Sequence, residues 1–145
     1  MSASESPEEA HQLIEFRRRN LPGFATVNAA LKDFEPKTAF SWHLSVLIRH
    51  ENEVGNKLPS DAEQSLLFAF EDRLDSLFKQ NGDALFLARV THDGRREVLW
   101  RTRNPKAADS VLSEILREKS YPREFAYRIE HDPKWEKAEW YLQNA

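Results

Sequence analysis

The spacing of apolar residues between residues 40 and 131 constrains the fold more than any other feature of the sequence. Apolar and polar residues alternate there, the pattern of a strand with one buried face, first along Phe40, Trp42, Leu44, Val46 and Ile48. The segments 84–91, 96–103 and 124–131 also predict strands, the last with Phe125, Tyr127 and Ile129 on one side.

Two helices are predicted between these strands. Ser60 and Glu63 form a capping box at the start of the first helix, and Asn81-Gly82 ends it. Its inward stripe is Ala62, Leu66, Phe70, Leu74, Leu77 and Phe78. Asn104-Pro105 begins the second helix, whose inward residues are Ala108, Val111, Leu112 and Ile115.

Strand, helix, strand, strand, helix, strand is the order of the ferredoxin-like fold. His92-Asp93-Gly94 joins the two middle strands as a tight turn, in which Gly94 supplies a positive φ. Right-handed crossovers place both helices on one face of a four-stranded antiparallel sheet. We therefore predict an α+β protein with a ferredoxin-like βαββαβ core, and the other face of its sheet is expected to be open.

The two ends of the chain predict further elements. Ser6-Pro7-Glu8-Glu9 is typical of a helix start, so a helix is expected to about Arg19. A short edge strand is expected over 24–28 and a helical turn over 29–34. After the last strand, Asp132-Pro133 caps a short helix that carries Trp135. We expect residues 1–21 to be an N-terminal helical extension and residues 22–145 a single ferredoxin-like domain.

Composition excludes several classes of protein. The 145 residues include no cysteine, which excludes disulfides, thiolate metal sites and cysteine nucleophiles. A net charge of −3 disfavours general attraction to nucleic acid or to anionic membranes. No apolar run approaches the roughly 20 residues of a membrane span, and the acidic N-terminus does not resemble a signal peptide. We therefore expect a cytoplasmic protein.

Catalytic, metal and RNA-binding motifs are also missing from the sequence. His50, His92 and His131 each precede an acid, but the predicted topology places His131 at the opposite edge of the sheet from the other two. The serines lack a nucleophile elbow, and four glycines form no phosphate loop. The third strand lacks the aromatic signature of RNA-recognition modules. We expect no cofactor and no metal, and we favour a protein without enzymatic activity.

The open sheet face is the best candidate for a binding surface. Alternation places arginines from three strands on it, together with a histidine: His43, Arg49, Arg101, Arg103 and Arg128. Such a surface could hold an acidic protein segment, a phosphate or a carboxylate ligand. Alternatively, Glu97 and Glu130 pair with these arginines and the face is an ordinary polar one. Arg95 and Arg96 could also supply charge to a ligand at the turn.

Three separated motifs resemble a bacterial family, the domain of unknown function 695. They are Leu58-Pro59 with Glu63, the stretch from Thr91 to Glu97, and the stretch from Glu130 to Glu136. The resemblance spans about residues 22 to 142. It implies no assigned activity, although some relatives are fused to a domain similar to the B-type regulator of ribonuclease E activity. Gly94, Asp132 and Trp135 in these motifs have structural explanations as turn, cap and docking residue.

Our leading hypothesis is a cytoplasmic bacterial protein that binds or regulates another protein through the open face, or associates with itself there. The alternative is a binder, or an enzyme, of a small anionic ligand at the same arginines. A concave pocket would favour the ligand, and a flat surface would favour the protein partner.

Overall fold

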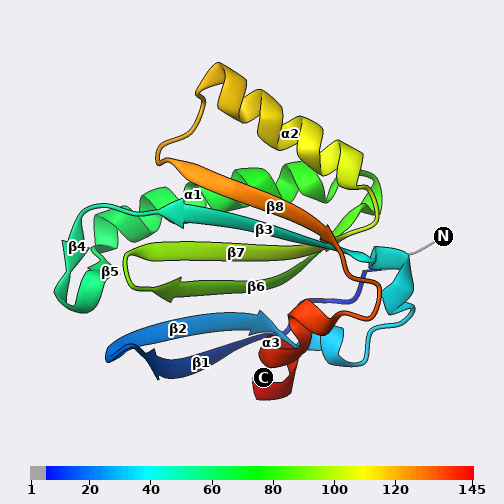
Figure 1. Cartoon of the computed structure of the whole chain (residues 1–145), viewed down its shortest axis with the longest axis horizontal. Helices are drawn as coiled ribbons and strands as arrows, with labels where there is room; N and C mark the ends of the chain where they lie inside the picture. Colours follow the sequence, from blue (N-terminus) through cyan, green and yellow to red (C-terminus); the bar gives the residue numbers. More distant parts are fainter. Residues whose placement is uncertain (1–5) are drawn as a thin grey trace.

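A six-stranded antiparallel sheet forms the core of the structure, a computed structural model that describes residues 6–145. The strands lie in the order β1-β2-β6-β7-β3-β8 (Figure 1). In that order they are β1 (His11–Arg18), β2 (Leu21–Asn28), β6 (Ala84–His92), β7 (Arg95–Thr102), β3 (Trp42–Arg49) and β8 (Phe125–His131). A separate ribbon pairs β4 (Glu53–Val54) with β5 (Leu58–Pro59), and the α-helices are α1 (Asp61–Phe78), α2 (Pro105–Glu118) and α3 (Glu139–Asn144).

The prediction of a four-stranded ferredoxin-like sheet is wrong, because the sheet has six strands, whereas the α+β class is confirmed. The order β3-α1-β6-β7-α2-β8 does run through residues 42–131. However, β2 pairs with β6 and β1 pairs with β2, so two N-terminal strands extend the sheet past β6. In Figure 1 these strands are the two blue arrows at the bottom of the sheet.

The predicted N-terminal helix is also wrong, because most of the segment forms β1. β1 pairs with β2 along its whole length, and Arg19 and Asn20 make the connecting turn with φ values of 55° and 63°. Ile14 and Phe16 are two residues apart, so they share one face of a strand, and both pack against a buried cluster. The proline and the acids before β1 are typical of a helix start. The residues that follow nevertheless form a strand, because they pair with β2 and pack against that cluster.

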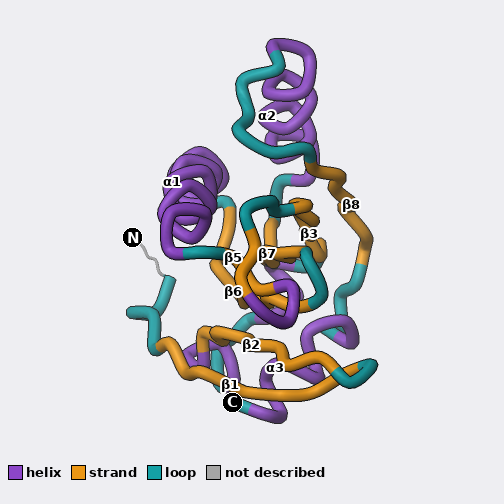
Figure 2. The backbone as a smooth tube through the Cα atoms, turned by 90° about the vertical axis from the view of Figure 1, so that its left-hand side faces the viewer, coloured by secondary structure: helices purple, strands orange, loops and turns teal. Residues whose placement is uncertain are grey.

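Helices α1 and α2 cover one face of the sheet, which we call the first face. Figure 2 shows both helices on the same side of the sheet. Leu74 of α1 and Leu112 of α2 are fully buried against it. Trp100 of β7 is fully buried in the same cluster, and its indole N–H donates a hydrogen bond to Asp75 Oδ1 of α1 at 2.8 Å.

The start of α1 differs from the predicted capping box in one respect. Ser60 Oγ accepts a hydrogen bond from the Glu63 amide at 3.2 Å, as predicted. The Glu63 carboxylate does not return to the cap and instead accepts two hydrogen bonds from Arg123, both at 2.8 Å. These bonds lower the pKa of Glu63 to about 2. They join the start of α1 to the segment that leads into β8.

The other face of the sheet, the second face, is not open along its whole length. The chain turns after β8 and brings α3 to β2, as the red segment of Figure 1 shows. Together with 3₁₀ turns at Ala29–Lys32, Lys37–Phe40 and Glu136–Ala138, this C-terminal segment covers a second buried cluster. The cluster includes Leu31, Phe40, Leu87, Leu99 and Trp135. Only the remainder of the second face can display side chains to a partner.

Candidate functional site

Two residues of the predicted binding surface, Arg101 and His43, are buried. Arg101 is fully buried, and its guanidinium donates to Asp132 Oδ2 at 2.9 Å and to the Asp132 carbonyl at 2.6 Å. It also donates to the Phe40 carbonyl at 3.3 Å, and Nη1 lies 3.2 Å from His43 Nδ1. The guanidinium carbon lies 4.6 Å from the centre of the Trp135 ring. These contacts leave Arg101 and His43 no access to a partner.

Four buried residues fasten the C-terminal segment to the second face. We call them the buried cluster: His43, Arg101, Asp132 and Trp135. Asp132 accepts hydrogen bonds from the backbone amides of residues 136 and 137 at 3.1 and 3.0 Å. The Trp135 indole N–H donates to the carbonyls of residues 37 and 40 at 2.9 and 3.0 Å. Burial alone would raise the pKa of Asp132, but the hydrogen bond from Arg101 lowers it below its usual value.

His43 is neutral in this cluster at neutral pH. Burial, reinforced by the charge of Arg101, lowers the pKa of His43 to about 4. The neutral imidazole can accept a hydrogen bond from Arg101 at Nδ1 while Nε2 carries the proton. His43 and Arg101 therefore have a structural explanation that needs no ligand.

Arg103 and Gly94 lie at opposite ends of β7, and both have local partners. Arg103 donates to Asp83 Oδ1 at 3.0 Å and to the Asn81 carbonyl at 2.6 Å, which holds the loop after α1. Gly94 has a φ of 78° and Asp93 a φ of 52°, so both central residues of the β6–β7 turn are left-handed. The tight turn that the sequence predicted is confirmed.

Exposed arginines gather on the uncovered end of the second face. Arg49 is there as predicted from alternation, and Arg18, Arg19 and Arg95 join it. Arg128 is exposed on the same face, as predicted, and lies opposite Ser45 near the middle of β3. Within the part of the chain that the structure describes, these side chains form no ion pair. We call this set the arginine surface: Arg18, Arg19, Arg49, Arg95 and Arg128.

Arg49 and Arg95 stand directly opposite each other on the paired strands β3 and β7. Like charges in directly opposed positions destabilise a sheet. A sheet selected for stability alone would favour a carboxylate at one of the two positions. The cross-strand arginine pair is therefore the feature of this surface that most needs a functional explanation.

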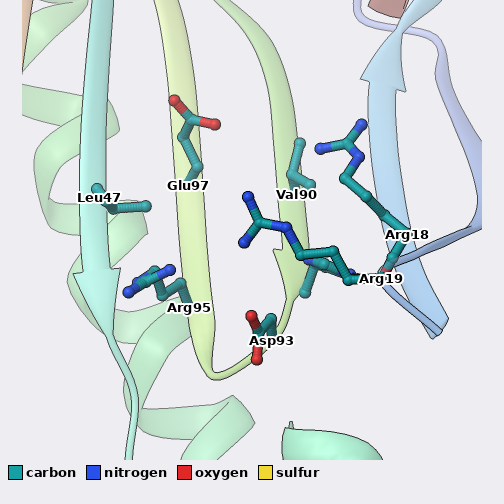
Figure 3. Close-up of a pocket in the computed structure, with 8 residues that line it drawn as sticks. Arg18, Arg19, Leu47, Val90, Asp93, Arg95 and Glu97 are labelled. Carbon is teal, nitrogen blue, oxygen red and sulfur yellow. Dashed lines mark hydrogen bonds between the residues drawn. The ribbon is translucent and has the colours of Figure 1, made fainter. Parts of the chain in front are cut away.

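A shallow groove of about 220 Å³ lies between Arg18, Arg19 and Arg95 (Figure 3). Figure 3 shows Arg18 and Arg19 on one side and Arg95 on the other, with Val90 and Glu97 between them on the strands. Arg18 is positioned by the rings of Phe16 and Trp140, 5.1 and 5.9 Å from its guanidinium carbon.

The acids of the groove already have partners. Asp93 lies 3.4 Å from Lys57 Nζ, and Glu97 accepts a hydrogen bond from Ser45 Oγ at 2.6 Å. In residues 6–145, neither acid lies within ion-pair distance of Arg18, Arg19 or Arg95. The guanidinium groups of the groove can therefore bind an external anion without first breaking an ion pair to a carboxylate of the protein.

An exposed leucine lies at the centre of the arginine surface. Leu47 of β3 is 39% exposed and lines both the groove and a neighbouring depression. Arg49 and Arg95 also line this depression. Four strand spacings separate β1 from β3, about 19 Å, so the surface is longer than one small anion. Sequence reasoning missed Arg18 and Arg19 because it assigned them to a helix end.

The family-model comparison gives one match. The chain matches the model described as Family of unknown function (DUF695) over residues 18–143. The chain belongs to the DUF695 family. The resemblance noted over about residues 22 to 142 is thereby confirmed, and the DUF695 match contains the whole arginine surface and the whole buried cluster. Searches of curated proteins and of solved structures found no match.

Among residues 6–145, no three His, Asp or Glu side chains come together in a way that could hold a metal ion. No helix in the same range has the length and apolar character needed to cross a membrane.

Proposed function

We propose that this DUF695 protein is a non-enzymatic binding module that holds an acidic segment of a partner protein on the arginine surface. The opposed pair of Arg49 and Arg95 carries the proposal, because an anion placed between them turns a repulsive pair into a favourable site. Control of the partner's activity through this contact, in a bacterial cytoplasm, is part of the same proposal.

The shape of the surface favours an extended polypeptide over a compact ligand. The arginines extend over several strands around Leu47, and arginine is enriched in protein interfaces. An acidic segment could place its carboxylates on Arg18, Arg49 and Arg95 in turn. An apolar side chain of the same segment could cover Leu47.

Electrostatics also disfavours self-association through this surface. A symmetric dimer would bring the same five arginines of two chains together, and opposing like charges cost free energy. An acidic partner of another kind avoids this cost.

Binding of a labelled acidic peptide tests the proposal. Fluorescence anisotropy compares a peptide rich in Glu with a peptide of the same length in which Gln replaces every Glu. We expect saturable binding of the Glu peptide alone, weakening at least about tenfold between low and physiological salt because the contacts are charge pairs. Equal binding of the two peptides, or binding of neither, would contradict the proposal.

Matched charge reversals place the contact on the molecule. The double variant Arg49→Glu with Arg95→Glu should lose at least about tenfold in affinity for the Glu peptide. Lys106→Glu with Arg117→Glu is the control, because Lys106 and Arg117 are exposed basic residues of α2 on the other side of the sheet. Equal losses in the two proteins would indicate general electrostatics and would remove the arginine surface from the account.

The groove keeps a small anionic ligand as the second candidate. Arg18, Arg19 and Arg95 surround a hollow large enough for a phosphate or a dicarboxylate. A thermal-shift titration with pyrophosphate and citrate separates the two candidates. Saturable stabilisation that disappears in Arg19→Ala would favour the ligand, whereas peptide binding without such stabilisation would favour the protein partner.

A further inference from the structure

A second pocket lies on the first face, away from the arginine surface, and it combines an apolar wall with a buried cation. It occupies about 380 Å³ between α1, the β4–β5 ribbon and strands β2 and β6. Its lining includes Leu13, Phe24, Leu58, Phe68, Thr91 and Arg96. This size falls within the range of small-molecule sites, about 300–1,000 Å³. We call it the Arg96 pocket.

The rim of the Arg96 pocket exposes large apolar side chains. Leu13 is 65% exposed, Val54 60% and Phe68 38%. They come from β1, β4 and α1, so three separate elements present apolar surface at one place. Exposed apolar residues that converge on a concavity indicate a ligand-binding site more strongly than residues scattered singly.

The Arg96 guanidinium is buried without an acidic partner among the described residues. Arg96 is 2% exposed; Nε donates to Thr91 Oγ1 at 3.1 Å and Nη2 donates to Gln64 Oε1. Nη1 is buried with no hydrogen-bond partner in the same part of the chain. A buried charge without a counter-ion is costly, so proteins rarely keep one that has no use.

A second arginine that lines the same pocket, Arg89, differs from Arg96 because it has an acidic partner. Arg89 binds Glu71 with two hydrogen bonds, at 2.7 and 2.6 Å, so its charge is compensated. Both guanidinium groups lie near the Phe68 ring, at 4.8 Å for Arg89 and 4.9 Å for Arg96. The remaining positive charge belongs to Arg96, and burial lowers its pKa to about 10, which still leaves it charged at neutral pH.

We propose that the Arg96 pocket binds a small amphipathic carboxylate. Arg96 lines the pocket, and a small shift of its side chain on binding brings Nη1, which is buried and unpaired in the free protein, to one carboxylate oxygen as a hydrogen-bond donor. The Thr91 hydroxyl accepts from Arg96 Nε and therefore keeps its own proton for the carboxylate. The apolar body of the ligand lies against Phe24, Leu58 and Phe68. This site is independent of the proposed protein contact.

Amide NMR of the full chain with octanoate tests the proposal. Octanol carries the same body without the charge, and acetate carries the charge without the body. We expect saturable shift changes at amides of β2 and β6 with octanoate, and at least about tenfold weaker binding of octanol and of acetate. Octanol that binds as tightly as octanoate, or octanoate that does not saturate, would overturn the proposal.

Two arginine variants separate a ligand role from a structural role. Arg96→Met should bind octanoate at least about tenfold more weakly and should unfold no more easily than wild type, because it removes an uncompensated buried charge. Arg89→Met is the control and should unfold more easily, because it leaves Glu71 unpaired. Unchanged octanoate affinity in Arg96→Met, or a loss of stability matching that of Arg89→Met, would overturn the proposal.

Two variants at the rim of the pocket test the site without altering its buried groups. Leu13→Glu and Leu13→Lys change an exposed residue at the mouth of the pocket by opposite charges. Octanoate should bind at least about threefold more weakly to the Glu variant than to the Lys variant. Equal affinity in these two proteins would contradict a carboxylate in this pocket.

Discussion

Arg95 and Arg101 lie on the same face of the same strand, yet their environments are opposite. Arg101 is fully buried beneath the C-terminal segment, where Asp132 and Trp135 engage its guanidinium. Arg95 is exposed at the other end of β7, beside the groove, and stands opposite another arginine. The difference arises from what covers the strand and not from the strand itself. One sheet face therefore supports both a structural centre and the exposed surface for which we propose a binding role.

Removal of the buried arginine should have the largest effect on stability. Arg101→Ala leaves Asp132 buried without its partner, so the free energy of unfolding should fall by about 3–5 kcal/mol. Denaturant melts monitored by tryptophan fluorescence measure it. Arg128→Ala on the exposed part of the face is the comparison and should stay within about 0.5 kcal/mol of wild type. A cost below about 1 kcal/mol for Arg101→Ala would break the contrast between the two ends.

Trp135 should matter nearly as much, because it closes the same end of the face. Its side chain is 2% exposed and packs with Phe34 and Phe40. Trp135→Ala should cost about 3–5 kcal/mol in the same melts. The exposed Trp140, 38% exposed on α3, is the matched control, and Trp140→Ala should cost much less. Equal small losses would mean that the C-terminal segment is peripheral.

The buried end should also lose stability in acid. The pKa of His43 is about 4 in the folded protein against 6.5 in the unfolded chain, so the unfolded state binds the proton first as pH falls. Stability from this group is therefore lost as pH falls from about 6.5, and the loss approaches roughly 3 kcal/mol near pH 4.

The variant His43→Asn isolates this contribution. Asparagine offers an acceptor in place of Nδ1 but does not titrate. Its unfolding free energy should therefore depend less on pH between about 6.5 and 4 than that of wild type. His50 also has a pKa lowered by burial and remains in both proteins, so the difference between them reports His43. Parallel pH profiles would show that His43 is not buried as a neutral group.

The β6–β7 turn gives a smaller expected effect at the exposed end. Gly94→Val should cost about 1–3 kcal/mol, because a β-branched side chain is strained at a φ of 78°. A Cβ there would also lie 3.1 Å from Glu53 Oε2. Gly94→Asn should be milder, since asparagine tolerates left-handed backbone. Equal melting of the two variants would contradict the turn geometry that carries Arg95.

Local patterns in the sequence were sufficient for much of the fold. The spacing of Phe70, Leu74 and Phe78 placed a face of α1, and Asn104-Pro105 placed the start of α2. The segment before β2 was predicted as a helix because Ser6-Pro7-Glu8-Glu9 carries helix-start signals. That segment pairs with β2, and β2 pairs with β6, more than 60 residues away in the sequence. Such long-range pairing cannot be predicted from the local periodicity of apolar residues.

The candidate site was predicted in part for the same reason. Alternation placed Arg49, Arg101 and Arg128 on one face of the sheet. It could not show that Asp132, 31 residues along the chain, folds back over Arg101 and removes it from solvent. Arg18 was missed with its strand. The Arg96 pocket was also missed, because its walls come from β1, β2, β4 and α1, which meet only in the folded protein.

The single variant Arg95→Glu tests the central claim, that the uncovered end of the second face serves binding and not stability. The introduced carboxylate would face Arg49 across the strands, so the free energy of unfolding should rise by about 0.5 kcal/mol or stay unchanged. The affinity for the acidic peptide should fall at least about tenfold in the same protein. A protein that loses stability, or that keeps its affinity, would contradict the account.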